Sequence, residues 1–147
     1  MKCVTSSSLQ VQWNGEYSPE FRPMRGIRHG DPLSPHLFNL TMKRLAHIIS
    51  HKVATKEWTT FRLARNDTPI SHLFYADDLV LYVKATLVNA SVIESSLDLF
   101  GACSGHMVNR HKTKVFFSPN TCPDIRHSIC AHLGYQEIND ISYRYIS

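Results

Sequence analysis

The chain reads ISHLFYADDLVLYV from Ile70 to Val83. Two β-prone runs in this stretch flank a short acidic turn, Ala76-Asp77-Asp78. This arrangement predicts an antiparallel β-hairpin with the acidic turn at its tip. Because turn residues at a hairpin tip face solvent, we expect the carboxylates of Asp77 and Asp78 to be exposed.

The paired acids at the tip allow two interpretations. Adjacent carboxylates repel each other, so a positive partner such as a divalent cation would stabilise them. Mg²⁺ suits this role because it accepts one or two carboxylates together with phosphate oxygens of a substrate. A solvated turn is the plainer alternative, since Asp is common in turns, and an isolated Asp-Asp pair favours it. The flanking sequence must therefore decide between the two.

Upstream of the acidic hairpin the sequence predicts another hairpin and a long helix. Alternating apolar residues surround Asn14-Gly15, a dipeptide that tolerates the positive φ angles of a tight hairpin turn. A polar loop then leads to Ser34-Pro35, an N-cap residue followed by a proline at the first helical position. The helix should continue to about His51. Its packed face is expected to consist of Leu37, Thr41, Leu45 and Ile48.

Downstream of the acidic hairpin the pattern predicts a helix, a strand and a helix. The first helix ends at residue 104, where Gly105 can adopt the left-handed conformation of a C-terminal cap. A strand is expected at 114–118 and a last helix at 122–133, and the chain beyond residue 135 is poorly patterned. Strands mixed with helices in this order favour an α+β layer, an antiparallel sheet with helices on one face.

Composition places the chain among globular proteins. Its 147 residues, 43% of them hydrophobic and 19% charged, are enough for one domain with a single core. A net charge of +4 permits a nucleic-acid partner, although charge alone speaks only to nonspecific attraction. There is no apolar run of about 18 residues and no apolar segment typical of a signal peptide. We therefore expect no membrane span and an intracellular protein.

The four cysteines are widely scattered and include no CxxC pair. Cys122, Cys130 and His132 lie near one another in sequence, but the gap between the two cysteines fits no usual zinc pattern. Buried structural thiols are the favoured interpretation, and a zinc-binding module is the distant alternative.

Three ordered blocks of sequence resemble the reverse transcriptases of non-LTR retrotransposons, especially the plant type. The string FYADDLVL at 74–81 resembles their YxDD box, motif C. Upstream, RGIRHGDPLSPHLF at 25–38 resembles motif B, and downstream SGHMVNRHKTK at 104–114 resembles motif D. The resemblance is clearest over 1–118, and it implies that 1–147 is a partial polymerase palm with an RRM-like or ferredoxin-like α+β fold.

The resemblance also implies a chemistry for the acidic turn. Asp77 would be a direct metal ligand and Asp78 would assist at the same pair of Mg²⁺ or Mn²⁺ ions. The parent enzyme would be an RNA-directed DNA polymerase. In it the two ions would promote in-line attack by a primer 3′-hydroxyl on a deoxynucleotide triphosphate. The implied partners are an RNA template, a DNA primer and deoxynucleotide triphosphates.

The motif B loop would lie beside the incoming nucleotide and the template. The residues that the resemblance places there are Arg25, Gly26, His29, Gly30, Asp31 and Pro32. Its two glycines would permit close backbone approach. Lys112 stands where the family carries a motif D lysine that could steady or protonate the leaving pyrophosphate. A basic residue before an edge strand is an equally good explanation of Lys112.

The sequence departs from the family pattern at two places. His29 stands where the family has Gln before the motif B glycine, which puts the contact geometry in doubt. Motif A, which carries another metal-binding aspartate, should lie well upstream of Arg25, and no such segment is found there. We therefore expect a reverse transcriptase fragment that is inactive alone. The alternative is a non-catalytic module, derived from a palm, that binds nucleic acid or another partner.

Overall fold

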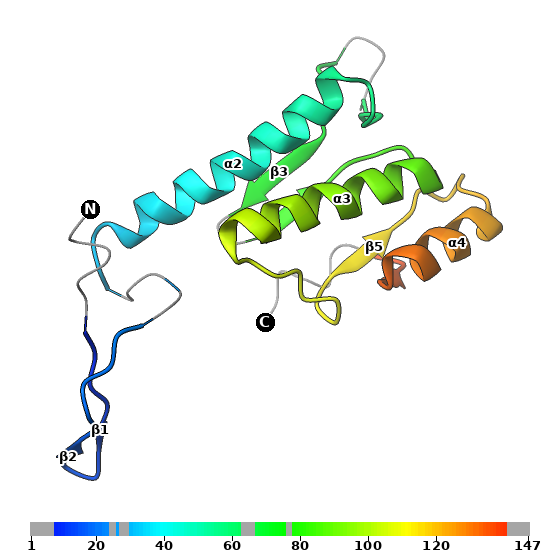
Figure 1. Cartoon of the computed structure of the whole chain (residues 1–147). Helices are drawn as coiled ribbons and strands as arrows, with labels where there is room; N and C mark the ends of the chain where they lie inside the picture. Colours follow the sequence, from blue (N-terminus) through cyan, green and yellow to red (C-terminus); the bar gives the residue numbers. More distant parts are fainter. Residues whose placement is uncertain (1–7, 24–25, 27–29, 63–66, 76–77, 141–147) are drawn as a thin grey trace. The chain divides into compact units, whose positions relative to one another are not determined.

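A computed structural model describes residues 8–23, 26, 30–62, 67–75 and 78–140 of the chain. The chain divides into two compact units, Met1–Thr41 and Met42–Ser147. Figure 1 traces the elements along the chain.

The first unit contains the predicted Asn-Gly hairpin. Strand β1, Gln12–Trp13, pairs antiparallel with β2, Glu16–Tyr17. The turn residues Asn14 and Gly15 have φ angles of 50° and 84°, the positive values that a tight hairpin turn requires. Exposed apolar side chains surround this hairpin, and Trp13 is 76% exposed.

Helix α2, Ser34–Ala54, confirms the predicted helix and extends one turn beyond the expected end. Leu45 and Ile48 are buried as expected, together with Ile49, and Leu37 and Thr41 are half-buried. The Thr41 hydroxyl donates a hydrogen bond to the Leu37 carbonyl at 2.9 Å, one turn back along the helix.

The second unit contains the hairpin expected from the acidic turn. Strand β3, His72–Tyr75, pairs antiparallel with β4, Asp78–Leu81, so that Tyr75 lies opposite Asp78. One face of the hairpin packs against α2 and α3, Leu87–Ser104 (Figure 1). The buried residues of this core are Leu45, Ile48, Ile49, Trp58, Ile93 and Phe100, and its half-buried hairpin residues are Phe74, Leu79 and Leu81.

Helix α3 has defined caps at both ends. The Thr86 side chain accepts a hydrogen bond from the backbone N–H of Asn89 at the N-terminus. Gly105 ends the helix with φ of 75°, and its N–H donates to the Gly101 carbonyl, as the sequence predicts. Gly101 has a packing role, because a Cβ added there would lie 2.8 Å from the His106 carbonyl oxygen.

The last elements form a β–α–β unit. Strand β5, Lys114–Phe116, pairs in parallel with β6, Gln136–Ile138, and α4, Pro123–Leu133, connects them. These elements pack in a second core, to which α3 contributes Ala90. Its buried residues are Ala90, Phe117, Ile129 and Leu133.

The structure confirms the expected α+β class and corrects its arrangement. We expected one antiparallel sheet, whereas the described strands form three two-stranded sheets, one of them parallel. Strand β6 lies beyond residue 135, where the sequence is poorly patterned and no element was predicted. The parallel pair arises because α4 returns the chain to run beside β5 in the same direction, as crossover connections do. No helix within the described ranges is long and apolar enough to cross a membrane.

Candidate functional site

Asp78 begins strand β4, and its side chain is exposed. Alternation along the two strands places Tyr75, Asp78 and Val80 on the face opposite the core. Tyr75 is 64% exposed there, whereas Leu79 and Leu81 turn toward the helices. The hairpin therefore presents the second acid of the YADD string to solvent, as expected. Ala76 and Asp77 lie outside the described residues.

The carboxylate of Asp78 makes no hydrogen bond or ion pair with any other residue that the structure describes. The nearest core residues, Phe74 and Leu79, are apolar and pack behind it against the helices. An exposed acid on a strand that packing holds in place is available to a cation from the solvent side.

Two residues that the sequence analysis did not single out hold the base of this hairpin. Trp58 is 2% exposed, and its indole Nε1–H donates a hydrogen bond to the Tyr82 carbonyl at 3.0 Å. Asn89 is buried at the start of α3, where its side-chain Nδ2 donates to the Lys84 carbonyl at 2.9 Å. Its Oδ1 accepts from the Thr59 backbone N–H at 3.2 Å.

These contacts tie the segment after β4 to the start of α3 and to the segment after α2. A buried amide with both ends hydrogen-bonded fixes backbone positions, since an unpaired buried polar group costs about 1–3 kcal/mol. The sequence signal for Asn89 was weak, because Asn at the third helical position also suits a capped helix start. Trp58 could have been found as an isolated large apolar residue in a polar connection.

The motif B segment belongs to the first unit, where the described part of its loop has two glycines with positive φ. Gly26 has φ of 88° and Gly30 has φ of 80°, so the expected backbone freedom is used at both. The Asp31 carboxylate accepts a hydrogen bond from the Leu33 N–H at 2.8 Å, and the Asp31 carbonyl accepts from the Ser34 N–H at 3.0 Å. Asp31 thus shapes the entry into α2.

The other predicted motif B residues divide into two groups. Pro32 is described and exposed, just before α2. Arg25 and His29 lie outside the described residues. The motif B loop and the YADD hairpin belong to different compact units.

Lys112 lies in a turn just before β5, in the second unit. The Asn109 side-chain oxygen accepts hydrogen bonds from the backbone N–H groups of His111 and Lys112, at 3.1 and 3.2 Å. Lys112 is exposed, and its ammonium group makes no ion pair with a described residue. Both interpretations of Lys112 remain predictions.

The residues considered for zinc have separate surroundings. Cys122 is exposed at the N-cap of α4, whereas Cys130 is half-buried against the second core. Burial raises the pKa of the Cys130 thiol, and the Glu137 carboxylate adds to this. His132 Nε2 lies 3.2 Å from the Ser91 hydroxyl and 3.5 Å from a Glu94 carboxylate oxygen. Over the described ranges no three His, Cys, Asp or Glu side chains are grouped to hold a metal.

Comparison with known proteins gives a family match over most of the chain. The family described as "Reverse transcriptase (RNA-dependent DNA polymerase)" matches residues 1–137. The chain is 35% identical over 85 residues to the Drosophila melanogaster "Retrovirus-related Pol polyprotein from type-2 retrotransposable element R2DM". It is 37% identical over 65 residues to the Arabidopsis thaliana "Uncharacterized mitochondrial protein AtMg01250".

The aligned regions cover different shares of these relatives. The match to the Drosophila protein covers 58% of this chain and 7% of that protein. The match to the Arabidopsis protein covers 44% of this chain and 53% of that protein. The chain thus spans a small part of one curated relative and about half of the other.

Proposed function

The chain belongs to the reverse transcriptase family, and from that premise we propose that it is part of the polymerase palm of a non-LTR retrotransposon enzyme. In the parent enzyme this part would carry the YADD hairpin of an RNA-directed DNA polymerase, within an RRM-like or ferredoxin-like palm. The proposal covers residues 1–147 as one partial domain. The observation that carries it is the exposed Asp78 at the head of β4, on a hairpin whose other face is packed against two helices.

Asp77 and Asp78 would hold Mg²⁺ or Mn²⁺ in the proposed site. The donor chemistry fits, because Mg²⁺ prefers carboxylate oxygens and keeps open positions for water and phosphate. When bound in the parent enzyme, the ions supply the positive charge that a nucleotidyl transfer needs. The packed hairpin would fix the direction of the Asp78 carboxylate, and the exposed face would leave room for a triphosphate.

The motif B loop and Lys112 would have supporting roles in the same reaction. Positive φ at Gly26 and Gly30 favours close approach of the loop backbone to the template or the nucleotide. The proposed contacts of this loop also include Arg25, His29, Asp31 and Pro32. Lys112 would place an ammonium group near the pyrophosphate, a role that its exposure permits.

We propose further that the 147-residue chain alone does not extend a primer. Two-metal transfer needs carboxylates from separate strands to hold both ions against phosphate charge. The Asp77–Asp78 segment supplies carboxylates from one hairpin only. A cation held by one hairpin is loosely placed, and misplacement by about 1 Å can cost about 100-fold in rate.

Manganese titration tests the metal site directly. Mn²⁺ broadens the NMR signals of nearby nuclei, so the backbone signals of Asp78 and of its cross-strand partner Tyr75 should be among the first to broaden in the ¹⁵N spectrum. The double variant Asp77→Asn, Asp78→Asn should abolish this effect. Asp67→Asn, an exposed acid outside the hairpin, is the matched control and should leave the broadening unchanged. Broadening that survives the double variant would contradict the metal proposal.

Primer extension tests the proposed inactivity. The chain is incubated with a poly(A)–oligo(dT) template-primer, dTTP and either Mg²⁺ or Mn²⁺. We expect no extension product. Extension by the intact chain that disappears in Asp77→Ala would show that another carboxylate completes the site, and the proposal of inactivity would be wrong.

A further inference from the structure

Charge is divided unevenly between the two helices that pack on the β3–β4 hairpin. Helix α2 carries two Lys, one Arg and three His, and it has no Asp or Glu. Helix α3 carries Glu94 and Asp98 and has no Lys, Arg or His. The acidic and basic side chains are thus segregated on different helices, which the net charge of +4 does not reveal.

The two acids of helix α3, Glu94 and Asp98, interact with other residues of the second unit. A Glu94 carboxylate oxygen lies 3.6 Å from a guanidinium nitrogen of Arg110, and the other lies 3.5 Å from Nε2 of His132. Asp98 lies close enough to Tyr135 to help raise the pKa of that phenol, although burial is the main cause. Helix α3 therefore directs its acids toward the β5–α4–β6 side of the unit.

Most basic side chains of helix α2 form no ion pair with an acid that the structure describes. Its Lys52 is paired with Glu57 at 2.6 Å, just beyond the helix end. In contrast, four exposed side chains form no hydrogen bond or ion pair with any part of the chain that the structure describes. They are Lys43, Arg44, His47 and His51, and they are called here the α2 cationic face.

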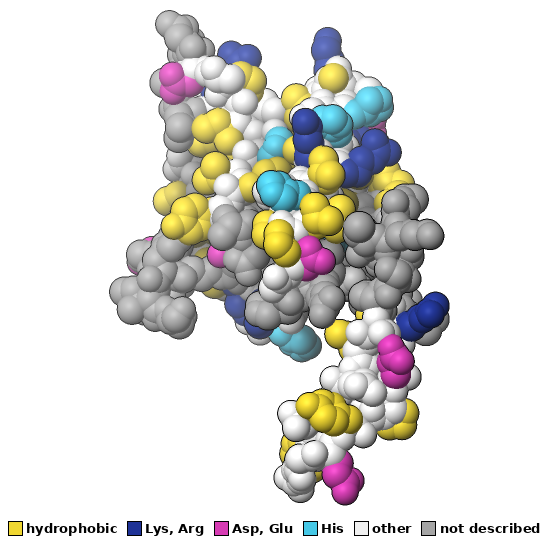
Figure 2. Space-filling model, turned by 90° about the vertical axis from the view of Figure 1, so that its left-hand side faces the viewer, with side chains coloured by type: hydrophobic (Ala, Val, Ile, Leu, Met, Phe, Trp, Pro, Cys, Tyr) yellow, Lys and Arg dark blue, Asp and Glu magenta, His cyan; other side chains and the backbone are white. Residues whose placement is uncertain are grey.

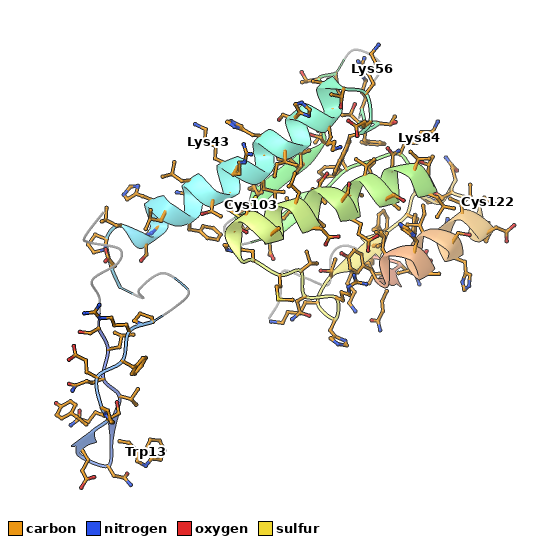
Figure 3. The ribbon with its side chains drawn as sticks, viewed as in Figure 1. Trp13, Lys43, Lys56, Lys84, Cys103 and Cys122 are labelled. Carbon is orange, nitrogen blue, oxygen red and sulfur yellow. The ribbon has the colours of Figure 1, made fainter. Side chains whose placement is uncertain are left out.

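The spacing of the α2 cationic face aligns its members. Lys43, His47 and His51 follow each other at four-residue intervals, so they lie along one side of the helix about 6 Å apart. The Lys43 side chain points away from α3 and β3 (Figure 3). Figure 2 shows Lys, Arg and His side chains gathered in the upper part of that view.

Helix stability does not explain this arrangement. Basic residues in the last turn interact favourably with the negative end of the helix dipole, which accounts for His51 and Lys52. Lys43, Arg44 and His47 lie in the middle of the helix, where the dipole offers nothing. Like charges four residues apart cost a helix roughly 0.2–0.5 kcal/mol per pair when both are charged.

We propose that the α2 cationic face binds the sugar-phosphate backbone of a nucleic acid. Lys43 and Arg44 are permanent cations, and helix α2 has no acid to neutralise them, so they suit a regular polyanion whose binding would release condensed counterions. The Arg44 guanidinium can hold a phosphate through two hydrogen bonds, whereas the Lys43 ammonium acts as a point charge. His47 and His51 add ring N–H donors. The inference rests on the proposed function in taking a nucleic acid as the partner. It adds a contact surface outside the 25–38, 74–81 and 104–114 segments, and this surface needs no metal.

Fluorescence anisotropy with the intact chain tests this surface. The probe is a fluorescein-labelled 20-mer of oligo(U) at pH 7.5, and EDTA is present so that the Asp77–Asp78 site cannot contribute. Because each lost phosphate contact lowers the salt slope of log Kd by about 0.7 for single strands, Lys43→Gln with Arg44→Gln should lower it by about 1.4. Affinity at about 0.15 M salt should fall roughly tenfold, equivalent to about 1.4 kcal/mol.

The matched control removes the same charge elsewhere. Arg62→Gln with Lys84→Gln changes two exposed cations outside α2 and should alter the affinity by less than about twofold. Equal losses in the two double variants would show that only net charge matters, which would overturn the proposal. Unchanged binding in the α2 variant would also overturn it. A third arm uses vesicles of phosphatidylserine and phosphatidylcholine, and binding to them as tight as to oligo(U) would rule against a nucleic-acid surface.

Discussion

The β1–β2 hairpin and the β3–β4 hairpin are both short antiparallel pairs, yet they differ in what surrounds them. The first is exposed on both faces, and Trp13 and Tyr17 are 76% and 67% exposed. The second has one face covered by α2 and α3 and one face open. Two-stranded hairpins are marginally stable alone in water, so packing gives the second its rigidity. A favourable turn thus fixes a hairpin's register, whereas burial on one face fixes the direction of its side chains.

Replacing a core residue beneath the second hairpin should have the largest effect. Ile49 is 1% exposed in the core that contains Phe74 and Leu79. We expect Ile49→Ala to lower the free energy of unfolding by about 3 kcal/mol, through lost burial and a residual cavity. Urea denaturation followed by circular dichroism measures this loss.

Leu40→Ala provides the control on the same helix. Leu40 is 65% exposed, so its truncation should change the unfolding free energy by less than about 0.5 kcal/mol. A cost below about 1 kcal/mol for Ile49→Ala would show that Ile49 is not tightly packed beneath the second hairpin.

The two tryptophans of the chain allow a direct test of the contrast. Trp58→Phe removes the hydrogen bond to the Tyr82 carbonyl and part of a buried ring, and we expect a loss of about 2 kcal/mol. Trp13→Phe, in the exposed hairpin, should cost less than about 0.5 kcal/mol. Both are measured by urea denaturation. Similar costs for the two variants would mean that Trp13 is also packed in solution.

The turn of the first hairpin should respond to a change in backbone freedom. Gly15 has φ of 84°, and an added Cβ would meet no atom within 4 Å, so the cost of Gly15→Ala is conformational only. We expect about 1 kcal/mol against the hairpin, measured as weaker cross-strand NMR contacts between Gln12 and Tyr17. Asn14→Gly keeps the positive φ accessible and should preserve these contacts. Contacts unaffected by Gly15→Ala would show that the turn tolerates the strain.

The smallest expected effect is a pH dependence from His72 on β3. Burial lowers the pKa of His72 below its usual value of 6.5. As pH falls through 6.5, the unfolded chain therefore takes up this proton before the folded chain does. The free energy of unfolding should fall in that range, and the stability that His72 contributes is fully present only above it.

Urea denaturation at pH 8 and at pH 5.5 measures this dependence. His72→Gln should reduce the difference between the two midpoints, whereas His127→Gln, an exposed residue of α4, should leave it unchanged. An undiminished difference in His72→Gln would assign the pH dependence to other groups.

Local signals predicted most of the elements. Asn14-Gly15 predicted the first hairpin, the β-prone runs on either side of Ala76-Asp77-Asp78 predicted the second, and Gly105 predicted the end of α3. These features depend on the chemistry of neighbouring residues, which a sequence shows directly. The exposure of Asp78 was expected from its place at the hairpin tip and is confirmed, whereas Asp77 lies outside the described residues.

Features that depend on distant partners were missed. Strand β6 has only three residues, two of them polar, and α4 separates it in sequence from its partner β5. Asn89 reads as an ordinary residue of a helix start until Thr59 and Lys84 are brought beside it. The division into three separate sheets likewise reflects tertiary packing, for which the short strands carry no periodic signal.

The parallel β5–β6 pair imposes an order on synthesis of the chain. Lys114 and Gln136 are 22 residues apart, so a ribosome adding about 5–20 residues per second needs about one to four seconds between them. A hairpin such as β3–β4 closes in about 1–10 μs, so it can form as soon as it emerges. Strand β5 instead lacks its pairing partner until Gln136–Ile138 has been synthesised. A nascent chain stalled before that point would carry an unpaired strand available to other chains.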